Sequence, residues 1–252
     1  MAYKKLNLND GDVLMAEHIA HIEEGISTAE AKEGRSVALN LLDNSCFLPQ
    51  HVVNQRAADS INGAKYSIDR WKGTTSTSTH GVSEKGLVIT HSGTGSGYCG
   101  VQQILPDNLA AAIEGKTVTV AVCMEDGTVY IRSGIPVNGA VSANFGNGFA
   151  QTYINNGLFS VRIMHNTSGA SVTVRWVALY DGEYTAETLP TYQPKGYSSE
   201  LLACQRYYHV YGTSAERPSH GKDCVPHMVA DAPSQGTITI DETTFYYNSA
   251  DL

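Results

Sequence analysis

Polar and apolar residues alternate strictly along short stretches in the middle of the chain. In residues 117–122 (TVTVAV) the even positions are all Val, which places them on one face of a strand. Residues 125–127 (EDG) form a tight-turn signal, and residues 128–132 (TVYIR) alternate again. The arrangement predicts a β-hairpin whose even-numbered valines face a core.

The same period recurs on both sides of this hairpin. Further strands are expected at residues 65–72, 87–91, 99–105, 149–154 and 159–163, with a helical turn at 107–114. In residues 171–178 the alternation predicts that four positions face inward, namely Val172, Val174, Trp176 and Ala178. About eight short strands at this spacing predict an antiparallel β-sandwich or jelly roll over residues 35–186.

Residues 187–252 read as a smaller β-rich C-terminal region. Residues 188–196 form a Pro-containing linker, and Ser198 is placed to cap a short helix that runs through Cys204. Strands are expected at residues 206–211, 237–240 and 244–247, with Asp241 and Glu242 in a turn. Three or four strands are marginal as a free domain, so we expect this region to pack on the sandwich or on symmetry mates.

Residues 15–29 (MAEHIAHIEEGISTA) carry a helical period instead. The heptad has Ile at both a and d, which favours three or four strands over two. The seam of this predicted oligomer consists of Met15, Ile19, Ile22, Ile26 and Ala29. The alternative is a single helix that packs on its own domain. The oligomeric interpretation makes residues 1–34 an N-terminal attachment arm and trimerisation helix.

Composition narrows the class of protein. The chain of 252 residues is 42% hydrophobic, enough for a core, and its 24 Gly and 14 Tyr fit a mainly β fold with tight turns. A net charge of −8 argues against a nucleic-acid partner. No apolar run approaches the roughly 18 residues of a membrane span, and the N-terminus lacks a signal-peptide core. Five scattered cysteines predict neither a disulfide framework nor a zinc site, which fits a reducing cytoplasm.

The beginning of the chain resembles that of many bacteriophage baseplate and tail-fibre proteins. Residues 10–12 (DGD) and 21–26 (HIEEGI) match the usual form, whereas Met15 replaces a Thr that can cap the helix. The resemblance implies that the N-terminal region attaches the protein to other tail or baseplate proteins and begins a homotrimer.

The rest of the chain resembles phage and prophage tail proteins. Four segments carry this signature: residues 40–47 (NLLDNSCF), 54–56 (NQR), 66–71 (YSIDRW) and 200–208 (ELLACQRYY). Two further stretches are similar to carbohydrate-binding-module jelly rolls, namely 115–120 (GKTVTV) and 174–183 (VRWVALYDGE). These motifs keep the family order. They imply the fold of the chain and its place in a phage tail more directly than they imply which ligand it binds.

No arrangement of residues predicts an enzyme or a cofactor. Residues 95–100 (GSGYCG) match GxGxxG, but a strand pattern follows where a dinucleotide site needs a helix. The three acidic pairs, Glu125 with Asp126, Asp181 with Glu183 and Asp241 with Glu242, each read as turn residues. No catalytic or metal site is therefore predicted, although the jelly-roll resemblance leaves open a structural calcium near Asp181 and Glu183.

Aromatic side chains are the best candidates for contact with a sugar, whose C–H face stacks on aromatic rings. Tyr98 lies in a Gly-rich loop, Tyr207, His209 and Tyr211 share one face of an expected strand, and Tyr246 is a further candidate. The alternative for each is ordinary Tyr packing with a solvated hydroxyl. Trp71 and Trp176 are interpreted as structural.

Together these patterns predict a non-enzymatic virion component, assembled in the bacterial cytoplasm and located in the tail. We expect a homotrimer attached to the particle by its N-terminus, which recognises a host surface glycan without membrane insertion. The alternative is a purely structural adaptor or decoration protein, of a phage or of a phage-derived injection system, with no ligand. A glycan hydrolase would require two carboxyl groups about 5–10 Å apart in a cleft.

Overall fold

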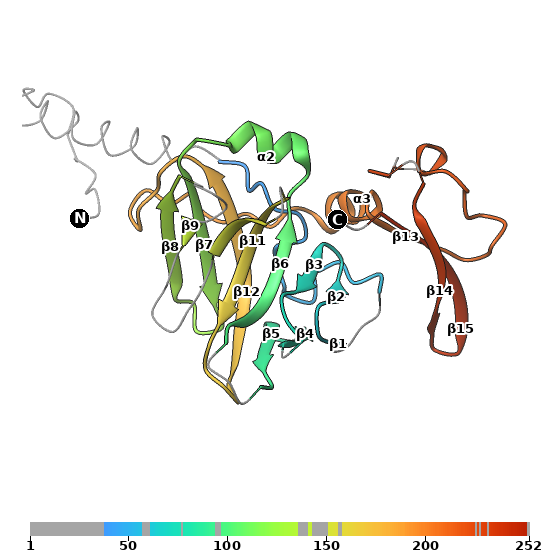
Figure 1. Ribbon diagram of the computed structural model, residues 1–252, viewed down its shortest axis with the longest axis horizontal. Coiled ribbons are helices and arrows are strands. Elements are labelled where there is room, and N and C mark those ends of the chain that lie inside the picture. Colours follow the sequence, from blue (N-terminus) through green and yellow to red (C-terminus); the bar gives the residue numbers. More distant parts are fainter. Residues whose placement is uncertain are drawn as a thin grey trace, which may run out of the picture.

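A computed structural model describes residues 38–56, 61–76, 78–93, 97–135, 141–142, 151–155, 158–224, 226, 228–230 and 232–250. The helix expected at residues 15–29 lies outside these residues, and so does the predicted seam of Met15, Ile19, Ile22, Ile26 and Ala29. The described chain contains two large antiparallel sheets and a small one (Figure 1).

The two large sheets each have six strands and form the predicted β-sandwich. The first runs, in spatial order, β1 (Ile61–Asn62), β4 (Ser78–Ser83), β5 (Gly86–His91), β12 (Ser171–Asp181), β7 (Val118–Met124) and β8 (Val129–Gly134). The second runs β2 (Tyr66–Ile68), β3 (Trp71–Gly73), β6 (Cys99–Ile104), β11 (Leu158–His165), β10 (Gln151–Asn155) and β9 (Val141–Ser142). Helix α2 (Asp107–Ile113) forms where the sequence predicts a helical turn. The mainly β prediction is confirmed.

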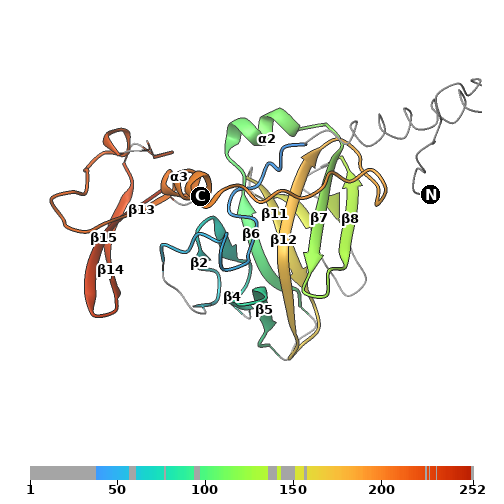
Figure 2. The ribbon, with the colours of Figure 1, turned by 180° about the vertical axis from the view of Figure 1, so that it is seen from behind.

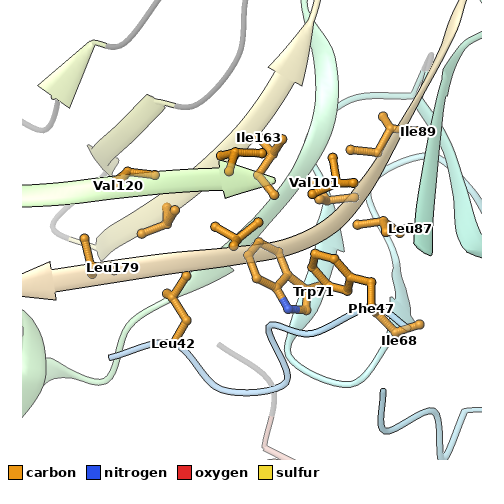
Figure 3. Packing of buried hydrophobic residues seen from close by; sticks show 14 of the residues in the cluster. Leu42, Phe47, Ile68, Trp71, Leu87, Ile89, Val101, Val120, Ile163 and Leu179 are labelled. Carbon is orange, nitrogen blue, oxygen red and sulfur yellow. The ribbon is translucent and has the colours of Figure 1, made fainter. Parts of the chain in front are cut away.

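The two sheets enclose the main hydrophobic core (Figure 3). Val118, Val120 and Val122 of β7 are 2% exposed or less and face this core, as their alternation predicts. From the opposite sheet, Val161 and Ile163 of β11 pack into the same cluster. Burial of one such side chain contributes roughly 1.5–3 kcal/mol, so this layer is the main source of the sandwich's stability.

Strand β12 contains a β-bulge that changes which residues face the core. Val174 belongs to the main core, but the register shifts before Trp176, and the next core residue is Val177. Trp176 and Ala178 therefore lie on the outer face of the sheet, where the Trp176 ring stacks on Tyr192 with centroids 4.3 Å apart. The prediction that Trp176 and Ala178 face the same way as Val174 is wrong, because one extra residue in a strand inverts its alternation.

Residues 184–196 cover this outer face, and we call them the strap. Tyr184 packs against the buried Tyr180, and its backbone N–H donates to Thr119 Oγ1 (3.0 Å). The stacking of Tyr192 on Trp176 holds the middle of the strap. The segment that the sequence assigns to a linker is thus packed along the sandwich.

The single strand predicted over residues 65–72 is a tight hairpin in the structure. Strands β2 and β3 pair with each other, and the chain reverses at Asp69 and Arg70. Arg70 has a φ of 72°, in the left-handed region that non-Gly residues seldom adopt. No Gly or Asn marks this turn in the sequence, which is why the pattern was insufficient to predict it.

The C-terminal region begins with α3 (Tyr197–Gln205), which follows Gly196 at its N-cap. No side chain caps this helix, so the capping role predicted for Ser198 is wrong. A three-stranded antiparallel sheet follows, in the order β13 (Tyr208–Tyr211), β15 (Thr243–Ser249) and β14 (Ser234–Ile240), with a short 3-10 helix, η1 (Gly221–Asp223), between its first two strands in sequence. Asp241 and Glu242 form the predicted turn, with φ of 46° and 64°.

The three-stranded sheet lies beyond α3, to one side of the sandwich, in both views of the molecule (Figures 1 and 2). Strand β8 lies at the opposite end of the sandwich. The small sheet therefore contacts the sandwich near one end of its own strands and does not stack on either large sheet.

Candidate functional site

The four segments with the tail-protein signature meet between the sandwich and α3, at a buried contact that we call the junction. Asn44 lies at its centre and is 1% exposed. Its backbone N–H donates to Glu200 Oε2 (2.7 Å), and its carbonyl oxygen accepts from Trp71 Nε1 (2.8 Å). Its side-chain amide donates to the carbonyl oxygens of Val53 and Asp69, both at 2.8 Å. One residue thus connects all four segments, since Val53 directly precedes residues 54–56.

Asp69 holds residues 54–56, the second signature segment, in place. Its carboxylate is fully buried, and Oδ2 accepts the backbone N–H of Gln55 at 2.7 Å. Oδ1 lies 3.4 Å from Nε of Arg56, which compensates the buried charge. The Arg56 guanidinium lies over the rings of Tyr66 (4.7 Å to the centroid) and Tyr208 (3.9 Å), an arrangement that favours a cation. Arg56 therefore joins a sandwich residue to a residue of the small sheet.

Arg70 makes the third connection. Its Nη2 donates to the carbonyl oxygen of Ile104 (2.7 Å), and its Nε lies 3.6 Å from Asp43 Oδ2. The guanidinium covers the ring of Tyr207 at 3.5 Å from the centroid, and Tyr207 is only 2% exposed. Lys195, in the strap, pairs with the other oxygen of Asp43 at 3.4 Å. The left-handed turn at Arg70 thus directs its side chain toward the C-terminal region.

Burial raises the pKa of three groups at the junction. Burial raises the pKa of Glu200, an effect that the hydrogen bond from the Asn44 N–H partly opposes. Burial also raises the pKa of the Cys204 thiol and of the Tyr207 hydroxyl. A thiol with a raised pKa is a poor nucleophile near neutral pH. Glu200 and Tyr207 connect the C-terminal region to the sandwich through their contacts with Asn44 and Arg70.

A groove of about 360 Å³ opens beside the junction, and we call it the junction groove. This volume is near the lower end of the range of roughly 300–1,000 Å³ for ligand sites. Three of the four signature segments contribute to it, through Arg56, Tyr66 and Tyr208. The rest of its lining comes from the small sheet: Ser234, Thr237, Ile238, Tyr247 and Ser249.

The register of the small sheet explains how Tyr247 reaches this groove. Tyr247 pairs with Gly236 across β14 and β15, and a Cβ added to Gly236 would overlap the Tyr247 ring. The ring therefore lies over the bare backbone of Gly236. It also contacts the Tyr208 ring, with centroids 5.0 Å apart. Tyr66, Arg56, Tyr208 and Tyr247 form a continuous series of ring and guanidinium contacts from the sandwich to the small sheet.

A second groove, of about 580 Å³, lies at the other end of the sandwich along the edge strand β8. Its lining combines Tyr130 and Arg132 of β8 with Glu183 and Tyr184 near the start of the strap. Ser133 ties the two sides together by donating to the carbonyl oxygen of Tyr184 (3.2 Å). None of the four signature segments lines this groove.

The structure separates the residues predicted to contact a glycan. Tyr207 is buried beneath Arg70, so it does not share an open face with His209 and Tyr211. His209 and Tyr211 do lie together, with stacked rings 4.3 Å apart, on the opposite face of the sheet from the junction groove. Tyr98 is 36% exposed and lies before β6, whose other end supplies the carbonyl oxygen bound by Arg70.

Three of the predicted acidic residues have structural partners. Glu125 forms an exposed ion pair with Lys85, and Asp126 Oδ1 accepts the backbone N–H of Thr128 (2.9 Å), as expected of turn residues. Asp181, considered for calcium, pairs with Lys116 at 3.4 Å. Among the described residues there is no group of three or more His, Cys, Asp or Glu side chains placed to share a metal ion.

Sequence reasoning missed the aromatic lining of the junction groove. Tyr66 and Tyr208 stand inside two of the signature segments, but the alternation of residues 206–211 favoured Tyr207 instead of its neighbour. The sequence did contain a signal, because Tyr207 and Tyr208 are consecutive. Consecutive side chains of a strand point to opposite faces, so the two rings cannot both lie on the predicted face. Tyr247 was recognised only as part of a strand.

Comparison with known proteins gave no family assignment: no family model, no curated protein and no solved structure matches the chain. Within the ranges that the structure describes, none of the helices has the length and apolar character needed to span a membrane.

Proposed function

We propose that the chain is a non-enzymatic structural component of a phage tail, in a fibre or baseplate, which attaches by its N-terminus and recognises a host surface glycan. In this proposal it assembles as a homotrimer in the bacterial cytoplasm and stays with the virion. The resemblance of residues 10–26 and of the four signature segments to tail proteins motivates it.

The observation that carries the proposal is the meeting of the four signature segments at the junction. They are separated by up to 156 positions, as between Asn44 and Glu200, yet they form one buried network. Such a network fixes the orientation of the small sheet relative to the sandwich. A rigid connection between modules is what a tail component needs in order to transmit contacts from a receptor to the particle.

A second candidate is a structural adaptor without a ligand. The small sheet favours it, because Val210, Ile238, Ile240 and Phe245 occupy one face and are only half-buried. An apolar sheet face of this kind suits burial against another protein. The two candidates differ in whether the end of the molecule that carries the small sheet stays open to solvent in the particle.

The first test is the solution mass by light scattering of the whole chain and of a chain that lacks residues 1–34. We expect a trimer for the whole chain. A trimer that survives the deletion would assign assembly to the sandwich and the small sheet, whereas a monomer would assign it to the isoleucine seam. A monomer in both cases would contradict a trimer that forms outside the particle.

The second test distinguishes a tail component that binds a surface glycan from an adaptor without a ligand. The whole chain, immobilised at defined density, is exposed to a panel of bacterial surface polysaccharides. Retention of at least one polysaccharide is expected, with trimers binding more tightly than monomers because avidity multiplies weak affinities by about 10²–10⁴. Failure to retain any of them would favour the adaptor.

A further inference from the structure

We propose that the junction groove binds an uncharged hexopyranose unit. The inference rests on the proposed recognition of a glycan, and it names both the site and the class of sugar. The site differs from every aromatic position that the sequence suggested, because it uses Tyr66 and Tyr247.

The aromatic walls of the groove provide the apolar contact. Tyr66 and Tyr247 are half-buried, so each ring retains a solvent-accessible part, whereas Tyr208 between them is 3% exposed. Tyr247 lies over Gly236 and cannot sink further into the sheet. A pyranose ring offers a flat C–H face that packs on such rings, because aromatic side chains combine a large apolar area with a polar tip.

The polar contacts come from the end of the small sheet nearest the sandwich. Ser234 and Ser249 pair with each other across β14 and β15, and both line the groove. Each hydroxyl can donate one hydrogen bond and accept two, which suits the hydroxyl groups of a sugar. Ile238 extends the apolar floor beside them. A few polar groups on a mostly apolar surface are typical of small-molecule sites.

The charge of the groove selects an uncharged sugar. Among the described residues of the lining, Arg56 is the only formally charged one, and its Nε lies 3.4 Å from the buried Asp69 carboxylate. Its guanidinium is also covered by the rings of Tyr66 and Tyr208. Because the Asp69 carboxylate already compensates the Arg56 charge, the described lining offers no uncompensated cation to a sugar carboxylate or phosphate. The groove therefore favours an uncharged sugar over an acidic one.

The experiment is an NMR saturation-transfer titration of the whole chain with the methyl glycosides of glucose, galactose, mannose and N-acetylglucosamine, and with glucuronic acid. We expect at least one neutral glycoside to bind, and glucuronic acid to bind more weakly than that glycoside. The Y247A variant should weaken this binding about tenfold, whereas Y247F should retain it because the ring remains.

Y246A is the matched control. Tyr246 is the sequence neighbour of Tyr247 on β15 but faces the opposite side, beneath Arg217. The Y246A variant should therefore leave sugar binding unchanged. If Y247A alters the fold of the small sheet, as amide chemical shifts would reveal, Y66A tests the same groove from the sandwich side and should also weaken binding.

Three results would overturn the inference: no neutral glycoside binds, binding survives both Y247A and Y66A, or glucuronic acid binds best. These results do not decide the proposed function. If the chain still retains a surface polysaccharide in the panel experiment, glycan recognition stands and its site is elsewhere. If neither sugars nor polysaccharides bind, the adaptor is favoured.

Discussion

The sandwich and the small C-terminal sheet are both antiparallel β structures, but they are stabilised in different ways. In the sandwich, β7 and β11 direct fully buried valines and isoleucines into a core between two sheets. In the small sheet no residue of β14 is buried, and the buried apolar cluster found among the described residues of the C-terminal region consists of Cys224, Met228 and Ala250. The sandwich therefore derives its stability from its own core, whereas the small sheet depends on the junction for its position.

This contrast can be tested with one substitution in the sandwich and one in the small sheet, and the sandwich substitution is expected to have the largest effect of all. Ile163→Ala removes a side chain with no exposed surface from the main core and should lower the free energy of unfolding by about 2–5 kcal/mol. Ile238→Ala removes a half-buried side chain and should cost less than about 1 kcal/mol. Urea unfolding of both variants measures the difference. Equal losses would mean that another copy or partner covers Ile238 in solution.

The next effect is expected at Asn44, which connects all four signature segments. Asn44→Gly keeps the left-handed conformation at φ 47° but removes the amide, and should cost about 2–3 kcal/mol by leaving the Val53 N–H without its partner. Asn44→Ala should cost roughly 1 kcal/mol more, because a Cβ disfavours that conformation.

Limited proteolysis provides the readout that distinguishes the two parts. In the Asn44→Gly variant we expect new cleavage between residues 206 and 250 before the sandwich is cut. Simultaneous loss of both parts would show that the junction also supports the sandwich core.

The smallest effect is a pH dependence at Glu200. Burial raises the pKa of this carboxyl, so the folded protein binds its proton more tightly than the unfolded chain does. The stabilisation is therefore present below the ordinary Glu pKa and is lost as the pH rises through the raised value. The thermal midpoint of the wild type, relative to Glu200→Gln, should rise by roughly 2–4 °C from pH 7.5 to pH 4.5. A constant difference would show that Glu200 titrates normally.

The sandwich should respond to acid in the opposite sense. Burial lowers the pKa of His80 and of His165, so the folded state binds fewer protons at these imidazoles than the unfolded chain. Their contribution to stability falls as the pH drops below about 6.5. For this reason the Glu200 effect is measured as a difference between two variants that share both histidines.

Some features of the sandwich could be predicted from the sequence and others could not. The alternation of residues 117–122 and the Glu-Asp-Gly turn specified β7 and its hairpin correctly, because each strand face is set by local period. The bulge before Trp176 could not be predicted, since a single inserted residue leaves no mark on composition. It moved the Trp176 side chain from the core to the outer face of the sheet, where it stacks on Tyr192 of the strap.

The candidate site was less predictable than the fold, because it depends on contacts between distant segments. The tail-protein signature pointed to the right stretches of chain but not to their meeting at Asn44, which involves partners 27 and 156 positions away. Of the glycan candidates, Tyr207 is buried because Arg70 covers it, whereas His209 and Tyr211 are half-buried. A local alternation cannot show which face a distant side chain will cover.

The hydrogen bond between Asn44 and Glu200 also sets an order of events during synthesis. At a translation rate of 5–20 residues per second, the ribosome needs roughly 8–30 s to add the 156 residues that separate them. During that interval the Asn44 N–H and the face of the Arg70 guanidinium that later covers Tyr207 have no partner from the C-terminal region. A chain that stops before residue 195 lacks both Glu200 and Tyr207, and therefore cannot close the junction.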